Sequence, residues 1–121
     1  MESKDENVVL CAANSYEKKY YFNDAFAILP QQVRDELQIL CVTYTEEIGG
    51  IMDLEFDPKG NLEFRTEAIE GDAMYDDIGS ALRIKQLRKE KEELFASLEL
   101  FYRVFVLKEG SPEKKNDSRA E

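Results

Sequence analysis

The sequence contains no histidine and no tryptophan. Without histidine, this chain cannot supply a Ser-His-Asp triad or a Cys-His pair for nucleophilic catalysis. Histidine-ligated sites for zinc, iron or copper are excluded for the same reason. Any general acid or base must therefore be a carboxylate, a lysine, a tyrosine or a cysteine.

Basic residues are scarce, since 16 lysines and arginines face 26 acidic residues and the formal net charge is −10. Binding to DNA or RNA phosphates depends on basic side chains that release counterions, so we expect no nucleic-acid partner. Anionic membrane surfaces repel such a chain equally, so we expect no membrane partner. A basic segment at 83–91 does not change this expectation, because one basic helical turn gives few phosphate contacts. The charge favours a basic protein partner instead.

Cysteines and long apolar runs are also few. The chain has two cysteines, Cys11 and Cys41, and its first apolar run, "VVLCAA", is too short for a signal peptide or a membrane span. Two cysteines fit a reducing compartment, so we expect a cytoplasmic protein in which both lie in the core. At 121 residues with 43% apolar residues, the sequence predicts one domain over 1–107, followed by a disordered charged tail over 108–121.

The first half of the chain predicts a hairpin followed by a helix. Residues 8–13 and 18–23 are rich in β-branched and aromatic side chains, and the first of these strands is expected to be buried on both faces. The helix begins near Pro30, carries apolar residues at helical spacing, and ends at the pair Gly49 and Gly50.

A second hairpin is predicted over 52–67, where apolar and polar residues alternate on both sides of a turn at 57–60. Gly60 suits the left-handed position of that turn. The expected register pairs Phe56 with Leu62, Leu54 with Phe64, Asp53 with Arg65 and Glu55 with Glu63.

One long helix is predicted from about residue 76 to residue 107. Five apolar side chains share a face of it: Leu87, Leu94, Leu98, Phe101 and Phe105. This face either packs on the sheet or forms the seam of a homodimer, although Lys91 would weaken such a seam. The predicted fold is α+β in the order β-β-α-β-β-α: a four-stranded antiparallel sheet with two helices on one face, the C-terminal one long.

The acidic residues are concentrated between positions 44 and 77, which hold eleven acids and two bases. A solvated face with acids at a helix N-terminus explains such a pattern, and so does a docking surface for a basic partner. The candidate acidic interaction surface comprises Asp53, Glu55, Glu63, Glu67, Glu70, Asp72, Asp76 and Asp77.

A metal site is the alternative use of these acids. A calcium loop of the EF-hand type beginning at Asp53 fails, because Pro58 stands where glycine is needed and Phe64 where a bidentate glutamate is needed. A carboxylate-only site for magnesium or calcium, built from the acids at 67–77, stays open but has no specific spacing. We therefore assign no catalytic residue, no metal ligand and no cofactor. Whether the chain is an enzyme stays open, and the lack of a nucleophile–base pair favours a non-enzymatic protein.

Three segments, "NVVLCAANSYEKKYYFN", "LPQQVRDELQILCV" and "YDDIGSALRIKQL", resemble a family of small uncharacterised proteins from anaerobic Firmicutes, a domain of unknown function. The resemblance covers about Asn7 to Leu107 and implies a bacterial, cytoplasmic setting, but no activity. The expected function is a protein-interaction module, of adaptor or chaperone-like kind, that binds a protein partner or a second copy through its acidic surface. The alternative is a domain that binds a small molecule or a divalent cation, with a carboxylate site that could make it an enzyme.

Overall fold

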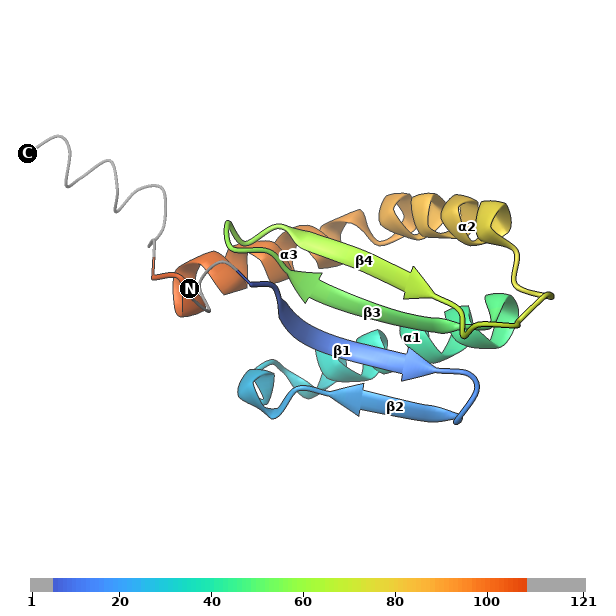
Figure 1. Cartoon of the computed structure of the whole chain (residues 1–121). Helices are drawn as coiled ribbons and strands as arrows, with labels where there is room; N and C mark the ends of the chain where they lie inside the picture. Colours follow the sequence, from blue (N-terminus) through green and yellow to red (C-terminus); the bar gives the residue numbers. More distant parts are fainter. Residues whose placement is uncertain (1–5, 109–121) are drawn as a thin grey trace, which may run out of the picture.

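The computed structural model describes residues 6–108, so the predicted tail lies outside the described residues apart from Lys108. Four antiparallel strands form one sheet in the order β2-β1-β3-β4, and the helices cover one of its faces (Figure 1). The elements are β1 Val8–Asn14, β2 Lys19–Phe22, the short 3-10 helix η2 Asp24–Phe26, α1 Gln31–Ile48, β3 Ile51–Phe56, β4 Leu62–Glu67, α2 Asp77–Glu90, α3 Glu92–Phe101 and the π-helical turn η3 Tyr102–Val106. The predicted α+β class and four-stranded sheet are confirmed.

The hairpin of β3 and β4 has the predicted register, including the pairs Asp53–Arg65 and Glu55–Glu63. The turn is closed by the Gly60 N–H, which donates to the Asp57 carbonyl at 2.9 Å, and Gly60 has a φ of 91°. Strict alternation on both strands fixes this register, because a slip by one residue would turn every apolar side chain away from the core.

β1 lies in the middle of the sheet between β2 and β3. A bulge at Leu10 shifts its register against β3, and Asn23 holds this bulge because its side-chain amide donates to the Val9 carbonyl at 2.7 Å. The expectation that the first strand is buried on both faces is wrong. Val9 and Ala12 are only half-buried, because α1 and α3 pack on the opposite face of the sheet.

The core lies between the sheet and the helices α1 and α3. Its centre holds Leu37 and Tyr44 of α1 with Met52 and Leu54 of β3, each at most 1% exposed. At one end of the core, three aromatic side chains pack together. There the rings of Phe56 and Tyr102 stack with centroids 4.1 Å apart, and Phe26 packs against both.

The single long C-terminal helix that the periodicity predicts is instead two helices, broken at Lys91. Residues 88–93 contain no apolar side chain, so no core contact holds the chain straight there. Lys91 instead pairs with Glu36 of α1, with 3.1 Å between Nζ and Oε2. The break lets α3 run along the sheet while α2 begins beyond its edge (Figure 1).

The predicted apolar face of this segment packs inward for most of its length. Leu87 and Leu98 are buried, and Leu94 and Phe101 pack against the core, whereas Phe105 is 60% exposed. A second copy could therefore contact this face freely only at Phe105.

Candidate functional site

On the face of the sheet opposite the helices, charged side chains gather on β3 and β4. Met52, Leu54 and Phe56 point into the core, so alternation directs Asp53 and Glu55 of β3 to the open face. The pairing with β4 places Glu63, Arg65 and Glu67 beside them. Four of the eight predicted surface acids therefore share one face with a single arginine; we call these four carboxylates the acidic face.

The middle of the acidic face is tied together by Asn7. Its side-chain amide nitrogen lies 3.0 Å from both Glu55 Oε1 and Glu63 Oε1, and donates to these oxygens. Arg65 Nε lies 3.5 Å from Glu55 Oε2. The Glu55 side chain is only 12% exposed, so the contacts with Asn7 and Arg65 offset part of the solvation that this carboxylate loses on burial.

Asp53 is the least satisfied of the four carboxylates. Its Oδ1 atom is buried, and no hydrogen-bond donor contacts it among residues 6–108. Burial and the adjacent Glu55 carboxylate raise the pKa of Asp53 to about 7, while Arg65 works in the opposite direction. Among residues 6–108, the surroundings of Asp53 therefore do not fully compensate the charge of its carboxylate.

The other four predicted acids lie elsewhere, in the loop 68–76 and at the start of α2. Asp72 accepts a hydrogen bond from the Tyr16 hydroxyl at 2.5 Å, and Asp76 caps α2 by accepting from the Gly79 N–H at 3.0 Å. Asp77 lies in the first turn of α2, and Glu70 is exposed. The structure therefore divides the candidate surface into an acidic face and a group of loop acids, two of which already have structural partners.

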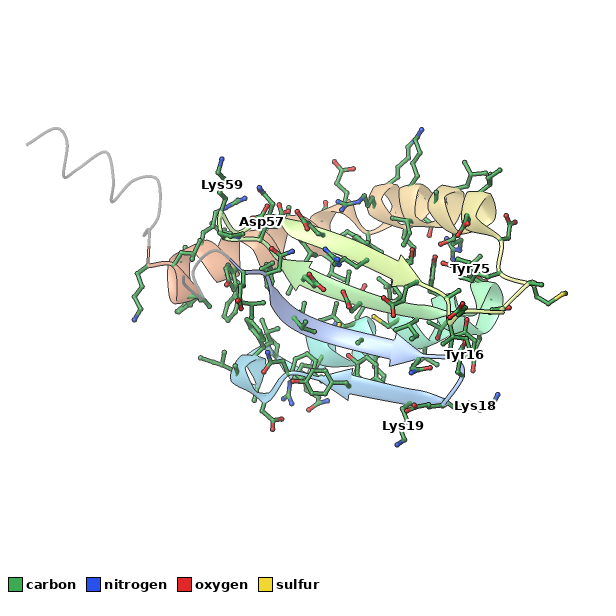
Figure 2. All side chains as sticks on the ribbon, in the orientation of Figure 1. Tyr16, Lys18, Lys19, Asp57, Lys59 and Tyr75 are labelled. Atoms are coloured by element: carbon green, nitrogen blue, oxygen red, sulfur yellow. The ribbon has the colours of Figure 1, made fainter. Side chains whose placement is uncertain are left out.

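This loop is held by three tyrosines and a serine. This role was not identified for them from the sequence. Tyr16 and Tyr75 lie at the same end of the sheet (Figure 2), and the Tyr16 hydroxyl also accepts from the Ile69 N–H at 3.2 Å. Tyr75 donates to Ser80 Oγ at 2.9 Å, and the Tyr44 hydroxyl lies 2.5 Å from the same atom. Tyr16 and Asp72 are 56 residues apart in the sequence, so no local sequence pattern predicts their contact.

A groove of about 710 Å³ runs between the β1–β2 hairpin and the second half of α1. It is lined by polar groups that include Lys18, Lys19, Gln38 and Glu46. Figure 2 shows both lysine side chains pointing away from the body of the protein at the end of the hairpin. The two lysines therefore do not converge on the groove, as the polar groups of a ligand pocket do.

The two cysteines lie against each other in the core, with 3.7 Å between Cys11 Sγ and Cys41 Sγ, and both are free and fully buried. The contact with Cys11 and burial raise the pKa of Cys41, which disfavours the reactive thiolate. The hydroxyl of Tyr20 is also buried, and burial together with these two thiols raises its pKa. This arrangement is typical of a structural pair rather than a catalytic nucleophile.

Most basic side chains of the segment 83–91 contact other parts of the protein. Arg83 Nε lies 3.0 Å from Glu47 Oε1, and Lys91 pairs with Glu36, so both join α2 to α1. Arg88 donates to the Leu62 carbonyl at 3.2 Å and lies over the Phe64 ring. Lys85 and Lys89 are exposed and form no ion pair within the described part of the chain.

Among residues 6–108, no three histidine, cysteine or acidic side chains are grouped so that they could hold a metal ion. Within the same residues, no helix has the length and apolar character needed to cross a membrane.

Comparison with known proteins identifies the chain at the level of a family. No curated protein and no solved structure matches it. A family model described as "Family of unknown function (DUF6145)" matches residues 7–110, which span both hairpins and all the helices. The chain therefore belongs to this family of unknown function, DUF6145.

Proposed function

We propose that the protein is a non-enzymatic interaction module whose acidic face binds a basic segment of a partner protein. The observation that carries this proposal is Asp53, a half-buried carboxylate with a buried oxygen that no donor contacts within residues 6–108. Its neighbours Glu55 and Glu67 add negative charge, and in the described part of the chain Arg65 opposes them. A guanidinium or ammonium group from a partner would compensate this excess negative charge through the carboxylate oxygens of the face that solvent can reach.

The spacing of the face favours an extended partner segment. Asp53 and Glu55 are two residues apart on one strand, which separates their Cα atoms by about 7 Å along the strand. An extended chain presents alternate side chains at the same interval. Arginine or lysine at every second position would therefore match this row, and Glu63 on β4 would widen the contact. Arginine fits better than lysine, because its planar group can bond two carboxylate oxygens at once.

We also propose a bacterial cytoplasmic setting, on the basis of the family resemblance and the two free thiols. The alternative function is a small-molecule or divalent-cation domain with a carboxylate site. Thermal unfolding with millimolar magnesium or calcium at matched ionic strength tests it, since a ligand that binds the folded state raises Tm.

The docking proposal is tested by titrating the labelled full chain with a decapeptide of alternating arginine and serine, followed by amide chemical shifts. We expect shifts that concentrate on β3 and β4 and weaken with added salt. Combining Glu63→Lys with Glu67→Lys should reduce affinity by about tenfold or more, because attraction is replaced by repulsion along β4.

The matched control combines Glu17→Lys with Glu46→Lys, which makes the same change in net charge away from the acidic face. This control should bind the peptide within about twofold of the unaltered protein, since long-range charge is screened by salt. Equal loss in both double variants would show that only net charge matters, and shifts outside β3 and β4 would place the binding elsewhere. Either result would reject the acidic face as a docking site.

A further inference from the structure

The helix α2 exposes apolar side chains on the side that faces away from the core. Ile78 and Leu82 are 75% and 62% exposed, and Met74, just before the helix, is 90% exposed. The inward side of the same helix is held by Ser80 and Leu87, which are buried. α2 therefore has apolar residues on both sides, whereas a helix that packs only on its own core has them on one.

The outward residues form a continuous stripe. At 100° per residue, Ile78, Leu82, Lys85 and Lys89 fall within about 60° of one another around the helix. All four are exposed, and Ala81 beside them is small and exposed. We call these five residues the α2 stripe. Its first half is apolar and its second half is basic with long alkyl stems.

Opposite charges stand at the two ends of this stripe. Asp76 and Asp77 lie at the N-terminal end of α2, and Lys85 and Lys89 lie toward its C-terminal end. The other bases of the segment are already engaged: Arg83 and Lys91 contact α1, and Arg88 contacts β4. Lys85 and Lys89 are thus the bases of this segment that an external partner can reach.

We propose that the α2 stripe is a contact surface for a second copy of this chain, packed antiparallel about a two-fold axis near Ala81 and Leu82. A two-fold contact brings the same surface together from both copies, so the surface must be complementary to itself. An antiparallel arrangement meets this condition. It sets the acidic start of one α2 beside the basic half of the other, and Leu82 against the small Ala81.

In this arrangement each Lys85 lies over the partner's Ile78. The alkyl stem covers the exposed isoleucine, and the ammonium group reaches the carboxylate of the partner's Asp77. The contact occurs twice by symmetry. Because only a few side chains per copy take part, the interface is smaller than a standard stable one, and association in the micromolar range is expected.

This inference is independent of the proposed docking function. The α2 stripe shares no residue with Asp53, Glu55, Glu63 and Glu67, so either proposal can fail without the other.

Sedimentation of the full chain over a wide concentration range tests the contact. We expect a monomer–dimer equilibrium that Ile78→Glu and Leu82→Glu each shift at least about tenfold toward the monomer, because a charge is buried in the apolar centre. Ile28→Glu and Leu100→Glu are matched controls, since both replace an exposed apolar residue elsewhere. They should leave the equilibrium unchanged. Circular dichroism confirms that each variant is folded.

A charge exchange tests the antiparallel orientation. Asp77→Lys alone and Lys85→Glu alone should each weaken self-association by about threefold to tenfold, because both symmetric contacts become repulsive. When these two variants are mixed, every 77–85 contact in the mixed dimer joins opposite charges. The mixed dimer should therefore form with about the affinity of the unaltered protein.

A chain that stays monomeric at the highest concentration reached would overturn the proposal. So would a dimer that persists in both Ile78→Glu and Leu82→Glu, or one that the two controls disrupt equally. Failure of the mixed pair to associate better than either variant alone would reject the antiparallel contact.

Discussion

The two hairpins of the sheet use the same pleat in different ways. Both turn apolar side chains inward, such as Phe22 and Tyr20 of β2 and Met52 and Leu54 of β3. Outward, the first hairpin presents Ala12 and Tyr21, whereas the second presents a row of carboxylates. The inward positions are alike because both hairpins pack against the same core. The outward positions are free of that requirement, and their difference is the basis on which the second hairpin is proposed as the docking surface.

Removing one aromatic ring from each hairpin should give the largest difference between them in the free energy of unfolding. Phe56→Ala should lower the free energy of unfolding by about 3–5 kcal/mol, because Phe56 is fully buried and stacked on Tyr102. Phe22→Ala should cost only about 1–2 kcal/mol, because Phe22 lies on the edge strand and is partly buried. Urea unfolding followed by circular dichroism measures both. Equal losses would mean that the edge strand is as much part of the core as β3.

A smaller effect is expected where the two hairpins meet, at Gly50. Gly50 has a φ of 78°, and an added Cβ would lie 2.6 Å from Tyr75 Cε1 and 2.8 Å from the Glu67 carbonyl oxygen. Gly50→Ala should therefore cost about 2–4 kcal/mol, combining backbone strain with displacement of Tyr75.

The neighbouring Gly49 separates these two causes. Its φ is 87°, but an added Cβ there meets nothing within 4 Å. Gly49→Ala should therefore cost only the backbone strain, about 1–2 kcal/mol. If the two glycine variants lose the same stability, the Tyr75 contact contributes nothing to holding the loop.

The smallest predicted change concerns pH and the acidic face. The pKa of Asp53 is about 7 in the folded chain against 3.8 as its ordinary value, so folding strengthens proton binding at this group. The free energy of unfolding should then fall as pH rises from about 4 to about 7, and level off above that. Because the side chain is only half-buried, solvent screening limits the loss to about 1–2 kcal/mol.

Asp53→Asn should remove this part of the pH dependence and raise stability at pH 8 by a similar amount. Glu17→Gln, in the exposed turn of the first hairpin, is the control and should leave the profile unchanged. Thermal unfolding across pH 4–8 compares the three proteins. If the unaltered chain and Asp53→Asn lose stability in parallel over this range, Asp53 is not the group responsible for the pH dependence.

Local pattern was enough to predict the second hairpin completely. Alternation over 52–57 and 62–67 gave its register, and Gly60 gave its turn, because each strand needs only its own apolar side chains to choose a face. The same argument predicted the outward direction of Asp53, Glu55, Glu63 and Glu67. Composition alone excluded catalysis that depends on histidine, because the chain contains none.

Tertiary structure decided the rest. β1 lies between β2 and β3, and the C-terminal helix breaks at Lys91, because contacts between distant segments outweigh local propensity there. The loop acids turned away from the acidic face because Tyr16 and the N-terminus of α2 hold Asp72 and Asp76. Whether an outward helical face is covered also depends on packing, so only the folded chain reveals that Ile78 and Leu82 remain exposed on α2. Sequence periodicity shows which residues share a face, but burial is a property of the surfaces that meet in three dimensions.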